Sequence, residues 1–408
     1  MEAFKVIAQG NGCLSAIIHF LTIKHQIMKN DPTLHGAAER ALERIKADYA
    51  DLLHAGPFCL ERRFAPEHFH FGEFCKDFRP HAESEFIKKE AEAFGRRYGA
   101  WLENSKHYIN VAWYLYPSAN PAQALTITKN LSLGFYLNDV MGRDVFPSLP
   151  VDAQQAARQM IENMALLDEQ LQLQPEAHPL EVANMEILRE FKSHSPRSWF
   201  QKFLRIYCHH LNITHRNRNA ASLGYIPDTY EYIENRCHYA AVHHLVMWIE
   251  YSDSTFLDWD KLMRTNFYQQ LQRLHWVVAA FPALANDLFS FENEVIDNDC
   301  DSNLVSVIVL NNPHMSLREA IDEAAAIVRN IVREIMDLLP KIEGEAHQLR
   351  NSYPDLASML TIHLNGITRF VQASWLWQAY SKRYKRPESI WQETRLVREP
   401  MTNSEAAS

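Results

Sequence analysis

Three side chains that carry oxygen atoms follow one another at intervals of four residues in segment 286–294. They are the amide of Asn286, the hydroxyl of Ser290 and the carboxylate of Glu294. On an α-helix each step of four residues advances about 40° around the axis, so all three lie on one face within about 80°. Oxygen ligands of these kinds suit Mg²⁺, which keeps several waters and shares its remaining positions with substrate phosphates. The spacing therefore favours a metal site that faces a diphosphate.

A plain polar helix face would carry the same residue types, because Asn, Ser and Glu are common. The preceding segment 276–285 is strongly apolar, which places the three side chains beside a buried wall and favours the metal site. On these residues alone both interpretations stay open.

Segment 286–294 also resembles the metal-binding motif (N/D)-D-(L/I/V)-x-(S/T)-x-x-x-E of the class I terpene synthases. The resemblance implies that Asn286, Ser290 and Glu294 bind one of three Mg²⁺ ions, with Mn²⁺ as a possible substitute. One departure is Asn293, which stands where a basic residue often precedes the Glu.

Segment 135–144 resembles the aspartate-rich motif of the same family, which carries the other two Mg²⁺ ions. Asn138 replaces the first Asp if Asp139 is the second; alternatively, Asp139 is the principal ligand and Asp144 closes the motif. Asp139 and Asp144 are roughly 140° apart around an ideal helix, so they do not share one face. The resemblance implies that Asp139 is a direct ligand, and that Asp144 binds directly, acts through water or pairs with Arg143.

Two basic segments complete the resemblance. Segment 226–236 resembles P-x-x-x-x-Y-x-x-x-R, whose Arg senses the diphosphate, and segment 377–384 resembles W-x-x-x-(S/T)-x-R-Y. The resemblance implies catalytic roles for Arg236, Arg383 and Tyr384, because guanidinium groups present paired N–H donors to phosphate oxygens.

The resemblance further implies a helix break at Tyr239 and Ala240, although Asp or Thr and then Gly are more typical there. Segments 79–83 and 303–305 resemble the family's N-P-H-A-E and N-L-V, with Arg79 in place of Asn.

The activity implied is metal-triggered ionisation of a linear prenyl diphosphate, with farnesyl diphosphate first and geranylgeranyl diphosphate next. The carbocation would cyclise to a terpene hydrocarbon or alcohol, and diphosphate would be released. Such a cation needs an apolar, aromatic-lined cavity that excludes water. Aromatic residues at helical spacing normally pack as plain core, which is the more frequent role for each candidate. The candidate lining residues are Phe135, Tyr136, Phe281, Trp375 and Trp377. Bound diphosphate could serve as the final base, since the sequence shows no dedicated one.

Composition predicts an all-α protein. The chain has only 12 Gly, and segments such as 83–98 and 317–339 repeat at helical period without alternating Val/Thr runs. The resemblance implies the helical bundle of class I isoprenoid synthases around a central active-site cavity. Residues 1–78 would be a helical extension packed on the core, residues 79–385 the catalytic domain, and residues 386–408 a frayed polar tail.

Several function classes are disfavoured. The net charge of −9 argues against a nucleic-acid partner. No run of 18 apolar residues exists, which predicts no membrane span. Six scattered Cys without C-x-x-C predict free thiols and a cytoplasmic protein. A homodimer is possible.

Neighbouring isoprenoid chemistries need motifs that are absent from this sequence. They are a second DDxxD for chain elongation, paired D-x-x-x-D for head-to-head condensation, and D-x-D-D for protonation-driven cyclisation. The remaining alternative is a non-catalytic isoprenoid-binding or scaffolding helical protein with a degenerate Asp motif.

Overall fold

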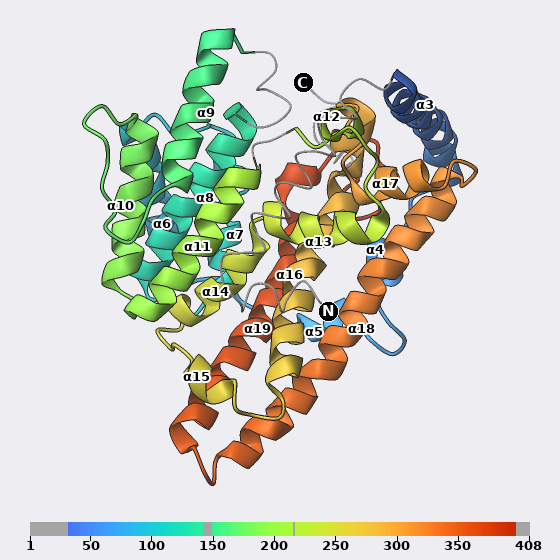
Figure 1. Ribbon diagram of the computed structural model, residues 1–408. Helices are drawn as coiled ribbons and strands as arrows, with labels where there is room; N and C mark the ends of the chain where they lie inside the picture. Colours follow the sequence, from blue (N-terminus) through green and yellow to red (C-terminus); the bar gives the residue numbers. More distant parts are fainter. Residues whose placement is uncertain (1–31, 142–148, 215–216, 397–408) are drawn as a thin grey trace, which may run out of the picture.

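The computed structural model describes residues 32–141, 149–214 and 217–396. Within these residues every regular element is helical and only two isolated β-bridges occur, so the predicted all-α class is confirmed. The helices form two groups (Figure 1). One contains α6 to α11 and the other α16 to α19, and α13 and α14 lie between them.

The N-terminal helices are α3 (Pro32–Ala55), α4 (Leu60–Phe64) and α5 (Phe71–Phe74). The first group contains α6 (Ser84–Arg97), α7 (Val111–Leu115), α8 (Pro121–Met141), α9 (Val151–Ala165), α10 (Pro179–Ser193) and α11 (Arg197–Thr214). The remainder comprises α12 (Ala220–Leu223), α13 (Thr229–Tyr239), α14 (Val242–Ser252), α15 (Trp259–Leu262), α16 (Tyr268–Phe291), a π-helix (Glu292–Asp297), α17 (Leu304–Asn311), α18 (Leu317–Leu349) and α19 (Pro354–Tyr380). Short 3₁₀ turns lie at Ser105–His107 and Lys382–Tyr384.

The two longest helices begin where the sequence supplies start signals. At the head of α18 the Ser316 hydroxyl accepts the backbone N–H of Glu319, and the Glu319 carboxylate accepts that of Ser316. This reciprocal capping satisfies two donors that the first turn would otherwise leave unpaired. Pro354 occupies the first turn of α19, where its missing N–H costs nothing.

The central helix is α16, which packs against α13, α14, α18 and α19. Together with the π-helix that follows it, α16 forms the helical segment Tyr268–Asp297. This segment is the one helix among the described residues that is long and apolar enough to cross a membrane. However, 78% of its most apolar window is buried inside the protein, which is the pattern of a core helix.

One face of α16 keeps some accessible surface while its neighbours are buried. His275, Pro282 and Asn286 are half-buried, whereas Val277–Phe281 and Ala283–Ala285 are buried. At 100° per residue these three side chains lie within about 40° of one another.

Residues 32–78, the described part of the N-terminal extension, pack on the helical core. The ring of Phe71 stacks on Trp375 of α19 at 4.4 Å between centroids, and Phe64 meets the same indole edge-on at 6.2 Å. Both Phe side chains are fully buried. Burial of each contributes about 1.5–3 kcal/mol, which holds the extension to the core.

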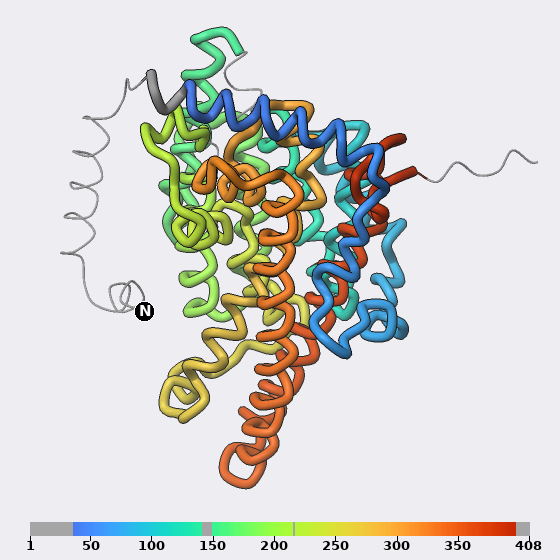
Figure 2. Tube along the Cα trace, turned by 90° about the vertical axis from the view of Figure 1, so that its right-hand side faces the viewer, coloured from blue at the N-terminus to red at the C-terminus, as the bar shows by residue number. Residues whose placement is uncertain are grey.

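The frayed tail predicted from residue 386 onward is wrong for residues 386–396. Glu292, at the start of the π-helix, accepts hydrogen bonds from Ser389 Oγ (2.6 Å), Ile390 N (2.9 Å) and, from α3, Tyr49 Oη (2.8 Å). Figure 2 shows this C-terminal segment beside the N-terminal extension. The sequence prediction failed because this segment is ordered by the buried carboxylate of Glu292, which is distant in sequence, and not by its own local composition.

A glycine contact in the core yields a testable prediction. A Cβ on Gly366 of α19 would lie 2.3 Å from Cγ2 of Ile249 and 2.8 Å from Oδ2 of Asp253. We expect Gly366→Ala to destabilise the protein by about 1–3 kcal/mol, because the helices must move apart. A Cβ on Gly344 of α18 would meet nothing within 4 Å, so Gly344→Ala should stabilise by about 0.5–1 kcal/mol. Denaturant unfolding of both variants measures the contrast, and equal shifts would contradict it.

Buried histidines predict acid sensitivity. Burial lowers the pKa of His243 and of His363 to about 3, and those of His244 and His275 well below their ordinary value. Unfolded histidines titrate near 6.5, so below that pH the unfolded state binds more protons than the folded one.

Each such histidine therefore lowers the unfolding free energy by about 1.4 kcal/mol per pH unit as the pH falls below 6.5. Glu250 changes the unfolding free energy in the opposite direction. Burial raises its pKa to about 7, so the stability that its protonated form contributes is lost as the pH rises through that value. We expect the four histidines to dominate, so the melting temperature should fall from pH 6.5 to pH 5. A melting temperature that stays constant over this window would disprove the prediction.

Candidate active site

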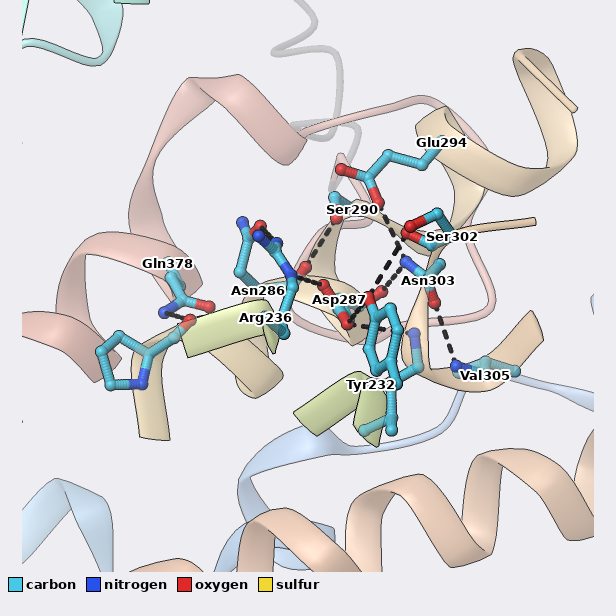
Figure 3. Close-up of polar contacts among 12 residues, drawn as sticks. Tyr232, Arg236, Asn286, Asp287, Ser290, Glu294, Ser302, Asn303, Val305 and Gln378 are labelled. Atoms are coloured by element: carbon cyan, nitrogen blue, oxygen red, sulfur yellow. Dashed lines mark hydrogen bonds and ion pairs between the residues drawn. The ribbon is translucent and has the colours of Figure 1, made fainter. Parts of the chain in front are cut away.

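The three predicted metal ligands follow one another along the end of α16 (Figure 3). Asn286 and Ser290 lie on α16, whereas Glu294 lies in the π-helix Glu292–Asp297. The sequence interpretation assumed α-helical spacing throughout, which is wrong beyond Phe291. A π-turn winds the backbone more widely and is often found at functional sites. It shifts Glu294 away from the direction that a regular α-helix would give it.

Asn286 is held at both ends of its amide. Its Oδ1 accepts from Nη2 of Arg236 at 2.8 Å, and its Nδ2 donates to Oη of Tyr384 at 2.8 Å. Ser290 Oγ donates to the backbone carbonyl of Asn286 at 2.7 Å, and Glu294 accepts from Nδ2 of Asn303 at 3.0 Å. The oxygens of the motif are therefore oriented by neighbours from α13, η4 (Lys382–Tyr384) and the α17 cap.

Asp139 lies near the end of α8. Its carboxylate accepts from Tyr108 Oη at 2.8 Å and from Asn138 Nδ2 at 3.1 Å, and it forms an ion pair with Arg383 at 3.7 Å. The Arg383 guanidinium also lies over the rings of Tyr108 and Phe135, at 4.8 and 5.2 Å from their centroids. Asp144, the other candidate ligand of this motif, lies outside the described residues.

The dipeptide Arg383–Tyr384 thus joins both motifs: Arg383 contacts Asp139, and Tyr384 contacts Asn286. Burial raises the pKa of Tyr384 to about 12, so its hydroxyl keeps its proton at neutral pH. Because Tyr384 accepts from Asn286, its own hydrogen is available to another oxygen. Burial alone would lower the pKa of Arg383, but Tyr384 and Asp139 raise it above its ordinary value. The guanidinium therefore stays charged.

Asp287 is a site residue that the sequence interpretation did not single out. It is fully buried and accepts from Arg236 Nε (2.7 Å), Tyr232 Oη (2.7 Å) and the Leu304 amide (3.0 Å). Burial raises the pKa of this carboxyl, and the Arg236 guanidinium opposes that shift. Burial alone would lower the pKa of Arg236, but Asp287 and Tyr232 raise it well above its ordinary value. An aspartate two residues after the apolar run 276–285 was the available signal for such a buried partner.

The helix does break after Arg236, at Ala240 and Ala241, although Tyr239 and Ala240 depart from the residues typical of the family's break. Ala241 has φ +69°, the left-handed conformation, and α14 begins at the next residue. A non-glycine residue there costs of order 1–2 kcal/mol, so the surrounding packing must impose the break. Tyr239, just before the break, lies below two cations: Arg236 at 5.5 Å and Arg218 at 4.5 Å from the ring centroid.

The five candidate lining residues occupy different places. Phe135 lies beneath Arg383, and Trp377 lies edge-on to Tyr384 at 5.8 Å, so both border the site. Tyr136 is half-buried on α8. Phe281 and Trp375 stack against Phe71 of the N-terminal extension, at 6.1 and 4.4 Å, within an aromatic core cluster.

The donor set fits a hard divalent cation. Asn286, Ser290, Glu294 and Asp139 offer only oxygen atoms, which Mg²⁺ prefers. The two guanidinium groups beside them suit a polyanionic ligand. Among the described residues, no cluster of three or more His, Cys, Asp and Glu side chains could hold a metal by itself.

A family model described as "Terpene synthase family 2, C-terminal metal binding" matches residues 129–334. Solved structures with the same fold include α-eudesmol synthase, with 18% identity, a TM-score of 0.61, and coverage of 74% of this chain and 96% of that one. A single-substitution variant of cucumene synthase has 16% identity and a TM-score of 0.60, covering 76% of this chain and 98% of that one. Germacradien-4-ol synthase from Streptomyces citricolor has 16% identity and a TM-score of 0.60, covering 74% and 97%. No curated protein sequence matches this chain.

Proposed function

The chain belongs to terpene synthase family 2, and on this premise we propose that it is a magnesium-dependent cyclase of a linear prenyl diphosphate. Farnesyl diphosphate is the preferred substrate and geranylgeranyl diphosphate the next candidate. The products are a cyclic terpene hydrocarbon or alcohol and free diphosphate.

One observation carries the proposal. Asp139, Arg236, Asn286 and the pair Arg383–Tyr384 come from four separate helical segments, yet contacts of 2.7–3.7 Å connect them and Asp287 into one polar network. A plain solvated helix face would not place two arginines and two sets of oxygen ligands together. The arrangement suits the binding of metal ions and diphosphate at a shared site.

We assign metal binding and diphosphate binding to different residues of the site according to their chemistry. Asn286, Ser290 and Glu294 would hold one Mg²⁺, and Asp139 would hold the others. When bound, these ions supply positive charge that stabilises the leaving diphosphate. Arg236 and Arg383 donate to diphosphate oxygens, and Tyr384 adds a hydroxyl donor. In doing so, each arginine exchanges its present carboxylate or amide partner for a phosphate oxygen.

The apolar surroundings protect the cation that remains. We call Arg236, Arg383 and Tyr384 the diphosphate clamp. Phe135 and Trp377 border this clamp, and their ring faces stabilise a positive charge. The buried wall of α16 behind Asn286 excludes water, which would otherwise quench the cation early.

Product analysis tests this function. Purified protein should be incubated with geranyl, farnesyl and geranylgeranyl diphosphate, each with Mg²⁺ and with EDTA, and the extracts analysed by gas chromatography–mass spectrometry. We expect a cyclic product from farnesyl diphosphate that disappears with EDTA. Binding of the diphosphates without any product would instead indicate the non-catalytic isoprenoid-binding protein.

A further inference from the structure

Residues 385–396 form an ordered segment that we call the C-terminal clasp. The clasp is anchored on Glu292, the first residue of the π-helix, which is only 2% exposed. Oε2 of Glu292 accepts from Ser389 Oγ at 2.6 Å, and Oε1 accepts from Ile390 N at 2.9 Å. The hydroxyl of Tyr49 on α3 donates to the same Oε1 at 2.8 Å. Three donors from two segments far apart in the chain therefore converge on one buried carboxylate.

The hydroxyl groups around this carboxylate have fixed donor and acceptor roles. Ser389 Oγ gives its one hydrogen to Glu292, so it accepts from Thr394 Oγ1 at 2.6 Å and from Trp391 N at 2.9 Å. Burial and the charge of Glu292 raise the pKa of Tyr49, so its hydroxyl keeps the hydrogen that it donates. The carboxylate thus holds a chain of hydrogen bonds that extends into the turn of the clasp.

The clasp is also bound at the other end of the π-helix and to the N-terminal extension. Arg386 Nη1 lies 3.1 Å from Oδ2 of Asp297, the last residue of the π-helix. On the side of the extension, Phe58 N donates to Ile390 O at 2.7 Å, and Gln392 N donates to Phe58 O at 2.8 Å. The clasp is therefore held to both ends of the π-helix and to the segment that precedes α4.

The clasp and the π-helix each carry part of the candidate active site. Tyr384, which donates no backbone break to the chain before the clasp, directly precedes residue 385 and accepts from Asn286 Nδ2 at 2.8 Å. Glu294 lies two residues after Glu292 in the same π-helix. Side chains two residues apart in a helical turn point to nearly opposite sides, so Glu292 faces the clasp while Glu294 faces Asn303. A shift of the clasp against the π-helix would therefore move the diphosphate clamp relative to a metal ligand.

We propose that Glu292 is a positioning residue that holds Glu294 and the end of the diphosphate clamp at the separation needed to bind Mg²⁺ and diphosphate together. This inference rests on the proposed function. The carboxylate of Glu292 is occupied by the clasp and by α3, so the residue acts through them and not as a ligand. Its loss should therefore weaken the binding of diphosphate in the presence of Mg²⁺, and a side chain that keeps the same contacts should restore it.

The decisive comparison is Glu292→Ala with Glu292→Gln, measured as the Kd for inorganic diphosphate at saturating Mg²⁺ by isothermal titration calorimetry. We expect Glu292→Ala to raise the Kd about tenfold or more, because small misplacements of binding groups are costly. In Glu292→Gln the amide oxygen accepts from Ile390 and Tyr49, and the amide N–H donates to Ser389, so the Kd should stay within about threefold of the wild type. A glutamine variant as weak as the alanine variant would overturn the proposal, because the charge and not the placement would then matter.

Two further variants separate positioning from general stability. Ser389→Ala removes one of the three donors and should fold even if Glu292→Ala does not; it should raise the Kd about threefold or more. Gly366→Ala crowds Ile249 within the helical core and leaves every contact of the clasp in place, so its Kd should equal that of the wild type. An equal rise of the Kd in Gly366→Ala would overturn the proposal.

Product analysis distinguishes this inference from the proposed function. If the wild type binds diphosphate but forms no terpene, the proposed function is wrong, and the Kd values still decide the role of Glu292. If the wild type is active and both Glu292→Ala and Ser389→Ala bind diphosphate as tightly as it does, only the positioning role is wrong.

Discussion

Asn286→Ala is expected to lower kcat by about a thousand-fold, the upper range for loss of one preorganised polar group at a reacting centre. The substitution removes a metal ligand and also the amide that orients Arg236 at 2.8 Å and Tyr384 at 2.8 Å. Metal binding and the diphosphate clamp are therefore weakened together. Steady-state diphosphate release at saturating Mg²⁺ measures the effect.

Two matched variants make this result interpretable. Asn293→Ala changes an exposed asparagine in the adjoining π-helix and should retain activity within about twofold. Asn286→Asp restores an oxygen ligand, and it should recover part of the lost activity. If Asn286→Ala keeps more than a third of the wild-type kcat, the metal assignment is wrong.

Asp287→Ala is expected to destabilise the fold by about 3–5 kcal/mol, because it leaves the Arg236 guanidinium buried without its carboxylate. The carboxylate also anchors Tyr232 and the first turn of α17 through the Leu304 amide. Activity should fall as well, since Arg236 loses the partner that aims it at the site. Denaturant unfolding gives the stability change, and diphosphate release gives the catalytic one.

A double substitution separates the two effects. Arg236→Met with Asp287→Leu replaces the buried charges by apolar groups and should be more stable than Asp287→Ala, while it remains inactive. Asp297→Ala breaks a half-exposed ion pair with Arg386 and should cost less than about 1 kcal/mol. If Asp287→Ala were no worse than Asp297→Ala, the buried ion pair would have no structural importance.

Several features of the site were predictable from the sequence because they depend on short-range spacing. The residues Asn286, Ser290 and Glu294 were identified by their four-residue repeat beside an apolar run. Helices at segments 83–98 and 317–339 followed from their periodicity, and the structure has α6 and α18 there. The meeting of Arg236, Arg383 and Asp139 was expected only from the family resemblance, because no local rule relates positions so far apart.

The sequence by itself determined that this chain is helical and that segment 286–294 repeats oxygen-bearing side chains at four-residue spacing, because hydrophobic periodicity and short-range spacing are local properties. The tertiary structure alone decided the π-turn at Glu294, the burial of Asp287 and the ordering of segment 386–396 on Glu292. It also brought His275 against His363. These features arise where packed helices bring distant polar groups together and every buried donor or acceptor must find a partner, a condition that no local pattern encodes.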